Sequence, residues 1–171
     1  MINARLISAL AALSFACAAL AQLSRPIRLG ESLPPLEVDY VKGDSIDAPN
    51  GHNITVVEFW ATWCAPCRMT IPHLSELQAR YGDRGFQVVG ISDEPPETVV
   101  PFVKQMADQM NYRVAVDRDG QTTLRFRDPE DGIPRAFLFN ELGALVWIGH
   151  PADNDLEQLI KELTDELNKN S

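Results

Sequence analysis

Cysteine is scarce in this sequence, and its scarcity excludes one class of exported protein. The 171 residues include three cysteines, at positions 17, 64 and 67. Small exported domains that rely on disulfides for stability carry several cysteine pairs at regular spacings. A chain of this length also buries a sizeable hydrophobic core without such crosslinks. We therefore expect no framework of structural disulfides.

Positive charge is also in short supply. The sequence has 15 Lys and Arg residues against 24 Asp and Glu residues, which gives a formal net charge of -9 at pH 7. Domains that bind nucleic acid usually present a basic patch or stripe to the phosphates. The composition therefore gives no support to a nucleic-acid partner, and no run of like charge marks an acidic tail.

Several other signals are missing. The glycine-rich fingerprint that cradles the phosphates of flavin or nicotinamide cofactors is absent. A second cysteine pair, which a cysteine-based zinc site needs, is absent as well. The chain also has no internal repeat and no low-complexity segment. We therefore expect one globular domain that holds no cofactor and no metal.

What the sequence does have, at its start, is a secretory signal. Arg5 is the only charged residue among the first 21, and an apolar stretch from Leu6 to Ala21 follows it. Ala19-Leu20-Ala21 has the small-x-small pattern that precedes signal-peptide cleavage. We therefore expect a signal peptide over 1–21 and a mature protein that is periplasmic or otherwise exported.

Two other interpretations of the N-terminus stay open. One is an uncleaved membrane anchor, although the stretch is shorter than the roughly 20 residues that span a bilayer and contains two serines. The other is lipid attachment at Cys17, although Ser14-Phe15-Ala16 lacks the branched apolar residue of a bacterial lipobox. Contact with a membrane is expected only if the N-terminus is uncleaved.

The remaining chain alternates between strand and helix signals. Residues 22–35 contain three prolines and are expected to form a tether, and residues 36–171 a single domain. Apolar runs and turn signals predict strands at 36–41, 55–60, 86–91, 113–116, 135–139 and 144–148. Helices are predicted at 64–81, 100–110 and 122–126, with a last one around 156–167. This alternation favours an α/β fold, with a central mixed sheet and helices on both faces.

The cysteine pair Cys64 and Cys67 lies where the buried strand at 55–60 leads into a helix. The first turn of a helix carries unpaired N–H groups and the positive end of the helix dipole, which stabilise a thiolate. Cys64 would then be the nucleophile, and Cys67, one turn along, would resolve the mixed disulfide. Pro66 stands in the first turn, where its missing N–H costs little. A structural disulfide and half of a zinc site are the alternatives.

The sequence around this pair, from Phe59 to Arg68, reads Phe-Trp-Ala-Thr-Trp-Cys-Ala-Pro-Cys-Arg. It resembles the active site of thioredoxin-like proteins, and in particular the exported TlpA/ResA/DsbE branch. Glu58 stands where thioredoxins carry a buried acid, Pro72 matches their helix-kinking proline, and Gly132-Ile133-Pro134 matches their cis-proline loop. The likeness covers 33–167, and residues 93–132 resemble the helix-strand insertion of the TlpA-like branch. The resemblance implies a thioredoxin-like fold with that insertion.

The resemblance also implies how the site works. Glu58, buried and with a raised pKa, would take the proton from Cys67 during resolution. A cis peptide bond before Pro134 would leave the Ile133 backbone free to pair with an extended substrate strand. A Glu58 without a catalytic task and a trans Pro134 are the plainer alternatives.

Four residues are expected to bind the substrate. They are the residues that flank the cysteines and those of the cis-proline loop: Trp63, Pro66, Ile133 and Pro134. Trp63 directly precedes the nucleophile and is expected to lie over the site, whereas Trp60 is expected in the core.

Together these features predict an exported thiol-disulfide oxidoreductase. It would reduce disulfides of client proteins through a dithiol/disulfide cycle of Cys64 and Cys67. The resemblance offers haem attachment in cytochrome c biogenesis or copper insertion as settings, and a membrane thiol reductase as the electron donor. Ala65-Pro66 between the cysteines leaves an oxidant or isomerase open, because the reduction potential depends on how far the thiolate is stabilised.

Two functions of other kinds compete with this one. A Cu(I) carrier would use the two thiolates with Met69 or His73, because soft sulfur ligands select Cu(I). A peroxidase usually carries Thr three residues before its reactive cysteine, and that residue here is Ala61. Thr70 departs from the branch itself, since it stands where some members carry an acid near the second cysteine.

Overall fold

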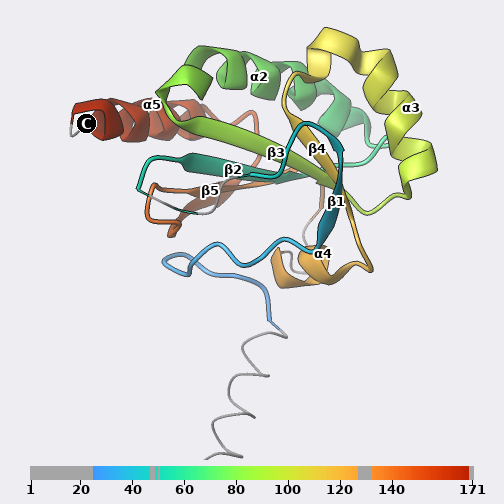
Figure 1. The fold of residues 1–171 in the computed structure, drawn as a ribbon, viewed down its shortest axis with the longest axis horizontal. Coiled ribbons are helices and arrows are strands. Elements are labelled where there is room, and N and C mark those ends of the chain that lie inside the picture. The colour runs from blue at the N-terminus through green and yellow to red at the C-terminus, as the bar shows by residue number, and fades with distance from the viewer. Residues whose placement is uncertain (1–24, 47–48, 50, 127–131, 170–171) are drawn as a thin grey trace, which may run out of the picture.

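A computed structural model describes residues 25–46, 49, 51–126 and 132–169. The expected signal peptide lies outside these residues. Within them, no helix is both long enough and apolar enough to cross a membrane. The described chain builds one sheet with helices on both of its faces (Figure 1).

The sheet has six strands in the order β1-β4-β3-β2-β5-β6. Their bounds are β1 Val38–Lys42, β2 Ile54–Phe59, β3 Phe86–Ser92, β4 Arg113–Asp117, β5 Arg135–Phe139 and β6 Leu145–Gly149. β2, β3 and β4 run parallel to one another, whereas β1, β5 and β6 each pair antiparallel with a neighbour. The sheet is therefore mixed, as predicted, and every predicted strand is present.

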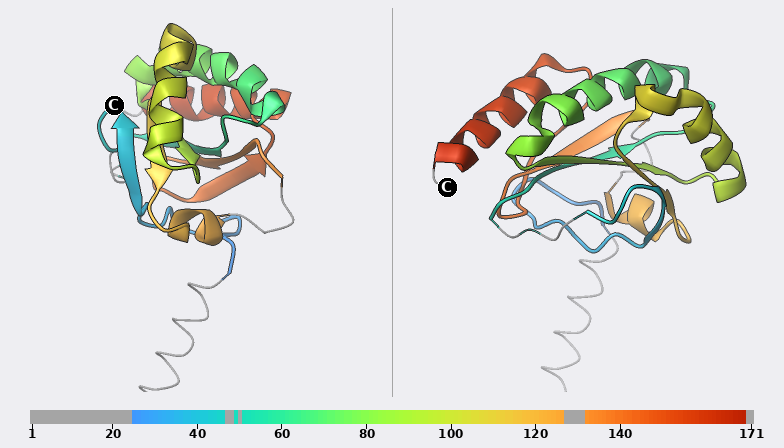
Figure 2. Two further views of the ribbon diagram at one scale, coloured as in Figure 1. Left: turned by 90° about the vertical axis from the view of Figure 1, so that its right-hand side faces the viewer. Right: turned by 45° about the horizontal axis from the view of Figure 1, so that its top comes forward.

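Helices cover the two faces unequally. α2 (Ala65–Tyr81), α3 (Pro96–Met106) and α5 (Asn154–Lys169) lie on one face, and α4 (Gln121–Phe126) lies on the other (Figures 1 and 2). Two short 3-10 helices, η1 (Gly82–Arg84) and η2 (Ala107–Met110), follow α2 and α3 directly. The predicted fold class is confirmed, including the additional helix and strand between β3 and β5.

β2 is buried on both faces, and its alternation divides the core in two. Val56 and Trp60, which lies just past the end of β2, pack with residues of α2, α3 and α5. Val57 and Phe59 pack on the opposite face, which α4 covers. Because successive side chains of a strand point to opposite faces, Glu58 lies on the α2 side of the sheet.

Gln78 of α2 pairs with the edge of β3 that β4 leaves open. β4 pairs with β3 only from Val89 onward. Ahead of that point, the side-chain amide of Gln78 accepts a hydrogen bond from the N–H of Val88 at 2.8 Å. The same amide donates one to the carbonyl of Phe86 at 3.2 Å. The C-terminal half of α2 is thus tied to the sheet by polar contacts.

The described part of the expected tether packs against the domain. The N–H of Ile27 donates to the carbonyl of Arg125 at 2.9 Å, and that of Leu33 donates to Gly143 at 2.8 Å. The Ile27 side chain is buried in the smaller core cluster, on the α4 side of the sheet. Residues 25–36 therefore cover part of this face.

The helix expected at 100–110 was placed wrongly at both ends. α3 starts at Pro96, whose fixed φ suits the first position of a helix. Pro101 therefore lies inside α3 rather than in its first turn. Ala107 has a φ of 48°, outside the helical region, and ends the α-helix.

The fold predicts a large penalty for removing apolar volume beneath α2. Leu74 is fully buried in the main core, and replacing a buried Leu by Ala typically costs about 2–5 kcal/mol. We expect Leu74→Ala to lower the free energy of unfolding by an amount in this range, measured by denaturant titration of the domain. Glu76→Ala, an exposed substitution on the same helix, should change it by about 0.5 kcal/mol or less. Equal losses in the two variants would contradict this packing.

Candidate active site

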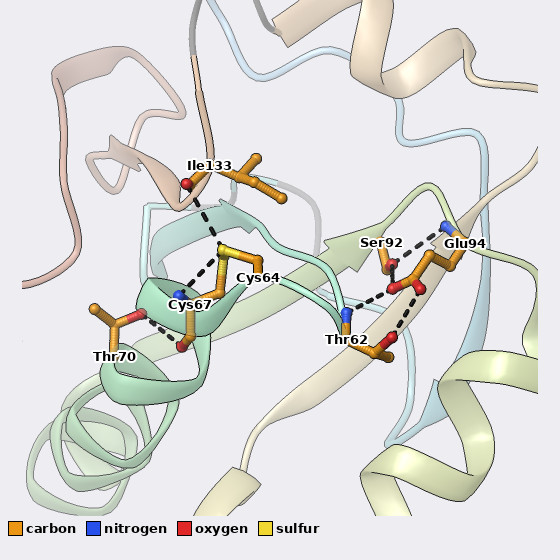
Figure 3. Close-up of a disulfide and its surroundings, with 7 residues drawn as sticks. All are labelled: Thr62, Cys64, Cys67, Thr70, Ser92, Glu94 and Ile133. Atoms are coloured by element: carbon orange, nitrogen blue, oxygen red, sulfur yellow. Dashed lines mark hydrogen bonds between the residues drawn. A yellow bond between two sulfur atoms is a disulfide. The ribbon is translucent and has the colours of Figure 1, made fainter.

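Cys64 and Cys67 form a disulfide at the start of α2 (Figure 3). Their sulfur atoms are 2.03 Å apart and their Cα atoms 5.3 Å apart. Cys64 is the N-cap residue of α2, and its Sγ accepts a hydrogen bond from the N–H of Cys67 at 3.2 Å. Cys67 is fully buried, whereas Cys64 keeps 3% exposure. A partner therefore approaches the disulfide from the Cys64 side.

The local sequence explains why the helix begins here. Cys64 has an extended backbone conformation, and Pro66 occupies the first turn, where no N–H is needed. No acidic residue stands in that turn. Unpaired N–H groups and the helix dipole therefore act on the Cys64 sulfur without opposition from within the turn. This environment favours the thiolate when the pair is reduced.

The loop that contains Ile133 and Pro134 faces the disulfide, as the resemblance implied. The carbonyl oxygen of Ile133 lies 3.7 Å from Sγ of Cys64 (Figure 3). The Ile133–Pro134 peptide bond is cis, and Pro134 is buried. β5 starts at the next residue, Arg135, so the loop is fixed to the sheet directly beside β2.

Glu58 lies inside the protein on the α2 side of β2. Its side chain is fully buried, and it stands opposite Gly90 of β3 and Ala136 of β5. Burial raises the pKa of Glu58 to about 8, since the charged form loses its hydration. Trp60 and Cys67 belong to the same core cluster on this side. An acid that changes protonation near neutral pH is thus placed in the core that holds the second cysteine.

The two tryptophans beside the disulfide have different environments, and Trp60 lies in the core, as predicted. Trp60 is buried, and its ring packs at a tilt against that of Phe102 of α3, with centroids 5.3 Å apart. Trp63, immediately before Cys64, is 71% exposed, and Met69 is 81% exposed. These two apolar side chains are exposed to solvent, and they flank in sequence the pair of which only Cys64 is accessible.

A carboxylate that the sequence analysis did not single out anchors the segment before Cys64. Glu94 accepts hydrogen bonds from the N–H of Thr62 at 2.6 Å and from its hydroxyl at 2.7 Å (Figure 3). Ser92 donates a weaker one to the same carboxylate at 3.3 Å. Ser92 ends β3 and Thr62 follows β2, so the contact joins the C-terminal ends of two adjacent parallel strands. That adjacency is the signal that could have predicted it.

Thr70 contributes no charge to the site. Its hydroxyl donates a hydrogen bond to the carbonyl of Cys67 at 2.9 Å, within α2, and the side chain is buried. The acid that some members of the branch carry at this point is therefore replaced by a neutral group that is satisfied inside the helix.

The fold is shared with solved structures of known proteins. A thiol:disulfide interchange protein of the thioredoxin family from Chlorobium tepidum is 25% identical, with a TM-score of 0.59 over 81% of this chain and 98% of that one. A thiol:disulfide interchange protein from Bacteroides sp. is 18% identical, with a TM-score of 0.65 over 81% of this chain and 91% of that one. The second likeness concerns the fold alone. Both support the thioredoxin-like fold.

Sequence comparison gives the family. The chain is 27% identical to the thiol-disulfide oxidoreductase ResA of Bacillus thuringiensis subsp. konkukian over 142 residues, which cover 81% of this chain and 80% of the relative. This relative confirms the expected resemblance to the TlpA/ResA/DsbE branch. The sequence profile of the AhpC/TSA family matches residues 29–148, which include the disulfide and the Ile133–Pro134 loop. With more than half of its length matched, the chain belongs to the AhpC/TSA family of thioredoxin-like proteins.

Proposed function

We propose that this protein is an exported thiol-disulfide oxidoreductase that reduces disulfides of client proteins through Cys64 and Cys67. One observation carries the proposal: the disulfide caps α2 and meets solvent only through Cys64, beside the Ile133 carbonyl. Relatives that bear the name thiol-disulfide oxidoreductase support it. Trp63, Pro66, Ile133 and Pro134 would surround the bound client.

The proposed cycle transfers two electrons and needs no cofactor. In the reduced protein, the Cys64 thiolate attacks a client disulfide, and one client sulfur leaves as a thiolate. Cys67 then loses its proton to the Glu58 carboxylate and attacks the Cys64 sulfur. The Cys64–Cys67 disulfide forms, and the second client sulfur leaves. The client has gained two electrons, and the protein is in the oxidised form that the structure describes.

The charges around the pair favour the reducing direction. Glu94 is bound two residues before Cys64 through Thr62, whereas the buried Glu58, whose pKa is raised to about 8, is mostly neutral at pH 7. Negative charge disfavours a thiolate, and a less stable reduced form gives a lower reduction potential. Arg68 adds a positive charge next to Cys67, but it is exposed, and solvent weakens its effect. Taken together, the charges near the cysteine pair favour a reductant over a strong oxidant.

The partners we propose follow from the resemblance. Clients would be exported proteins whose thiols must be reduced, for example before haem attachment in cytochrome c biogenesis or before copper insertion. The oxidised pair would be reduced again by a membrane thiol reductase, since the cycle consumes two electrons per client.

A reduction potential tests both the function and its direction. We expect a single two-electron transition near that of thioredoxin, about -270 mV, when the domain is equilibrated in graded dithiol and glutathione buffers. Thiol labelling of Cys64 would serve as the readout. A value near about -120 mV would reverse the direction of electron flow. The absence of a two-electron transition would remove the redox function and favour Cu(I) binding by the two thiolates.

Export is part of the same proposal. Residues 1–21 would be a signal peptide and 36–171 the functional domain, with 22–35 a tether whose described part packs against that domain. We expect the protein recovered from the periplasm of a bacterial host to begin at Gln22, as measured by intact-mass spectrometry. Ala21→Arg should block this cleavage, because signal peptidase requires a small residue there. A full-length mass in the membrane fraction would point to an uncleaved anchor, and a lipid adduct at Cys17 to a lipoprotein.

Glu58 makes the stability of the domain depend on pH. Because its pKa is raised from 4.5 to about 8, the folded state keeps a proton that the unfolded chain releases. Stability should therefore fall as pH rises through this window. Glu58→Gln should abolish that fall, which is on the order of 5 kcal/mol at 1.36 kcal/mol per pH unit. Denaturant titrations at pH 5 and pH 9 measure it.

The same variant tests the catalytic role. General base catalysis typically contributes about 100-fold or more, so Glu58→Gln should slow release of a client from the mixed disulfide by roughly this factor. Glu76→Gln on exposed α2 surface is the matched control, and it should leave both stability and release unchanged. Unaltered release in Glu58→Gln would leave the acid without a task in resolution.

A further inference from the structure

Three buried polar side chains converge on the α2 side of the sheet. Both carboxyl oxygens of Glu58, the indole Nε1 of Trp60 and the hydroxyl of Tyr112 are buried, and none has a hydrogen-bond partner within the described part of the chain. Buried polar groups in native proteins are nearly always paired, and an unpaired one costs about 1–3 kcal/mol. Three such groups in one place call for a common explanation.

Gly90 brings the three together. It stands opposite Glu58 in the parallel pairing of β2 with β3. A Cβ atom at Gly90 would lie 3.0 Å from Cε2 of Tyr112, 3.1 Å from Nε1 of Trp60 and 3.2 Å from Oε2 of Glu58. The three side chains therefore border the same small volume, which any side chain at position 90 would occupy.

The chemistry of these groups is complementary. An indole N–H can only donate a hydrogen bond, a phenol hydroxyl can donate one, and an ionised carboxylate can only accept. Burial and the nearby charge of Glu58 raise the pKa of Tyr112 well above its usual value, so its hydroxyl keeps its proton where Glu58 ionises. Trp60 and Tyr112 thus remain donors at every pH at which Glu58 is charged.

Within the described residues, the neighbouring strands place Gly90 and Ala136 opposite Glu58, and the core cluster on this side holds Cys67 of α2 and Trp60, which packs against Phe102 of α3. None of these groups carries a charge. Burial alone accounts for the raised pKa of Glu58.

Tyr112 also lines a hollow of about 320 Å³ that contains charged side chains, together with Lys42, Asp44 and Arg113. The Lys42 amine is held there by the carbonyl of Met110, at 2.6 Å.

We propose that Tyr112 and Trp60 are positioning residues that hold the ionised carboxylate of Glu58 by donating hydrogen bonds to it, and so keep it ready to accept the proton of Cys67. This inference rests on the proposed role of Glu58. Small side-chain rotations toward the volume beside Gly90 close the two contacts. When the proton passes from the Cys67 sulfur to Glu58, the carboxyl becomes neutral and both donors are released.

Tyr112→Phe tests the proposal because it removes one donor and leaves the ring in place. We expect the pKa of Glu58 to rise by about one pH unit, as the loss of one hydrogen bond to a charged group predicts. The carboxyl band of Glu58, identified as the infrared signal that disappears in Glu58→Gln, is followed as a function of pH in the full mature protein. Tyr81→Phe, another buried tyrosine of the same core cluster, is the control and should leave this titration unchanged.

A second readout separates this inference from the proposed function. The pH profile of client release should shift upward in Tyr112→Phe by the same amount as the titration. If the wild type releases no client but the titration moves in Tyr112→Phe alone, the positioning role stands and the reductase function falls. If the titration stays fixed, or moves equally in Tyr81→Phe, the positioning role is overturned even where the reductase activity is present.

Discussion

Glu58 is a carboxyl group buried without a countercharge, and its burial is the constraint on which the rest of the site depends. β3 and β5 flank it within the sheet, and the core beneath α2 covers it. The same packing that stabilises the domain raises the pKa of Glu58 to about 8. The packing of this core therefore also sets the acid–base behaviour of Glu58, so that a change in the packing changes its pKa. Gly90 makes the arrangement possible because it leaves room beside the carboxyl for Trp60 and Tyr112.

The junction between β2 and α2 orders the reacting groups by depth. Glu58 and Cys67 are fully buried, Cys64 is almost so, and Trp63 projects into solvent. Solvent can therefore reach the pair only at Cys64, whereas Cys67 and Glu58 are shielded from bulk water. Glu94 helps to hold this arrangement in place, because it accepts a hydrogen bond from the backbone N–H of Thr62, just before the exposed Trp63. In the proposed cycle, this strand-to-helix junction would separate the attack on the client, which needs access, from the resolution of the mixed disulfide, which needs shielding.

Much of this could be predicted from the sequence, because it depends on local patterns. Apolar runs indicated the strands, the Cys-x-x-Cys pair indicated the start of α2, and the apolar neighbours of Glu58 indicated its burial. The remainder depends on contacts between distant segments. Tyr112 borders the space beside Glu58 only because β4 lies beside β3, and Glu94 meets Thr62 only because β2 and β3 end at the same edge. The start of α3 was predicted wrongly because both Pro96 and Pro101 suit the first turn of a helix, and the sequence pattern does not distinguish between them.

The side-chain amide of Gln78 affects whether copies of this protein can pair with one another through their strands. β4 does not pair with the first residues of β3. Without another partner, the carbonyl of Phe86 and the N–H of Val88 would be open to pairing with an extended segment of another chain. Gln78 satisfies both from within the same molecule. An open strand edge is a template for intermolecular pairing and aggregation. A single helical side chain therefore protects this edge of β3 from pairing with another chain.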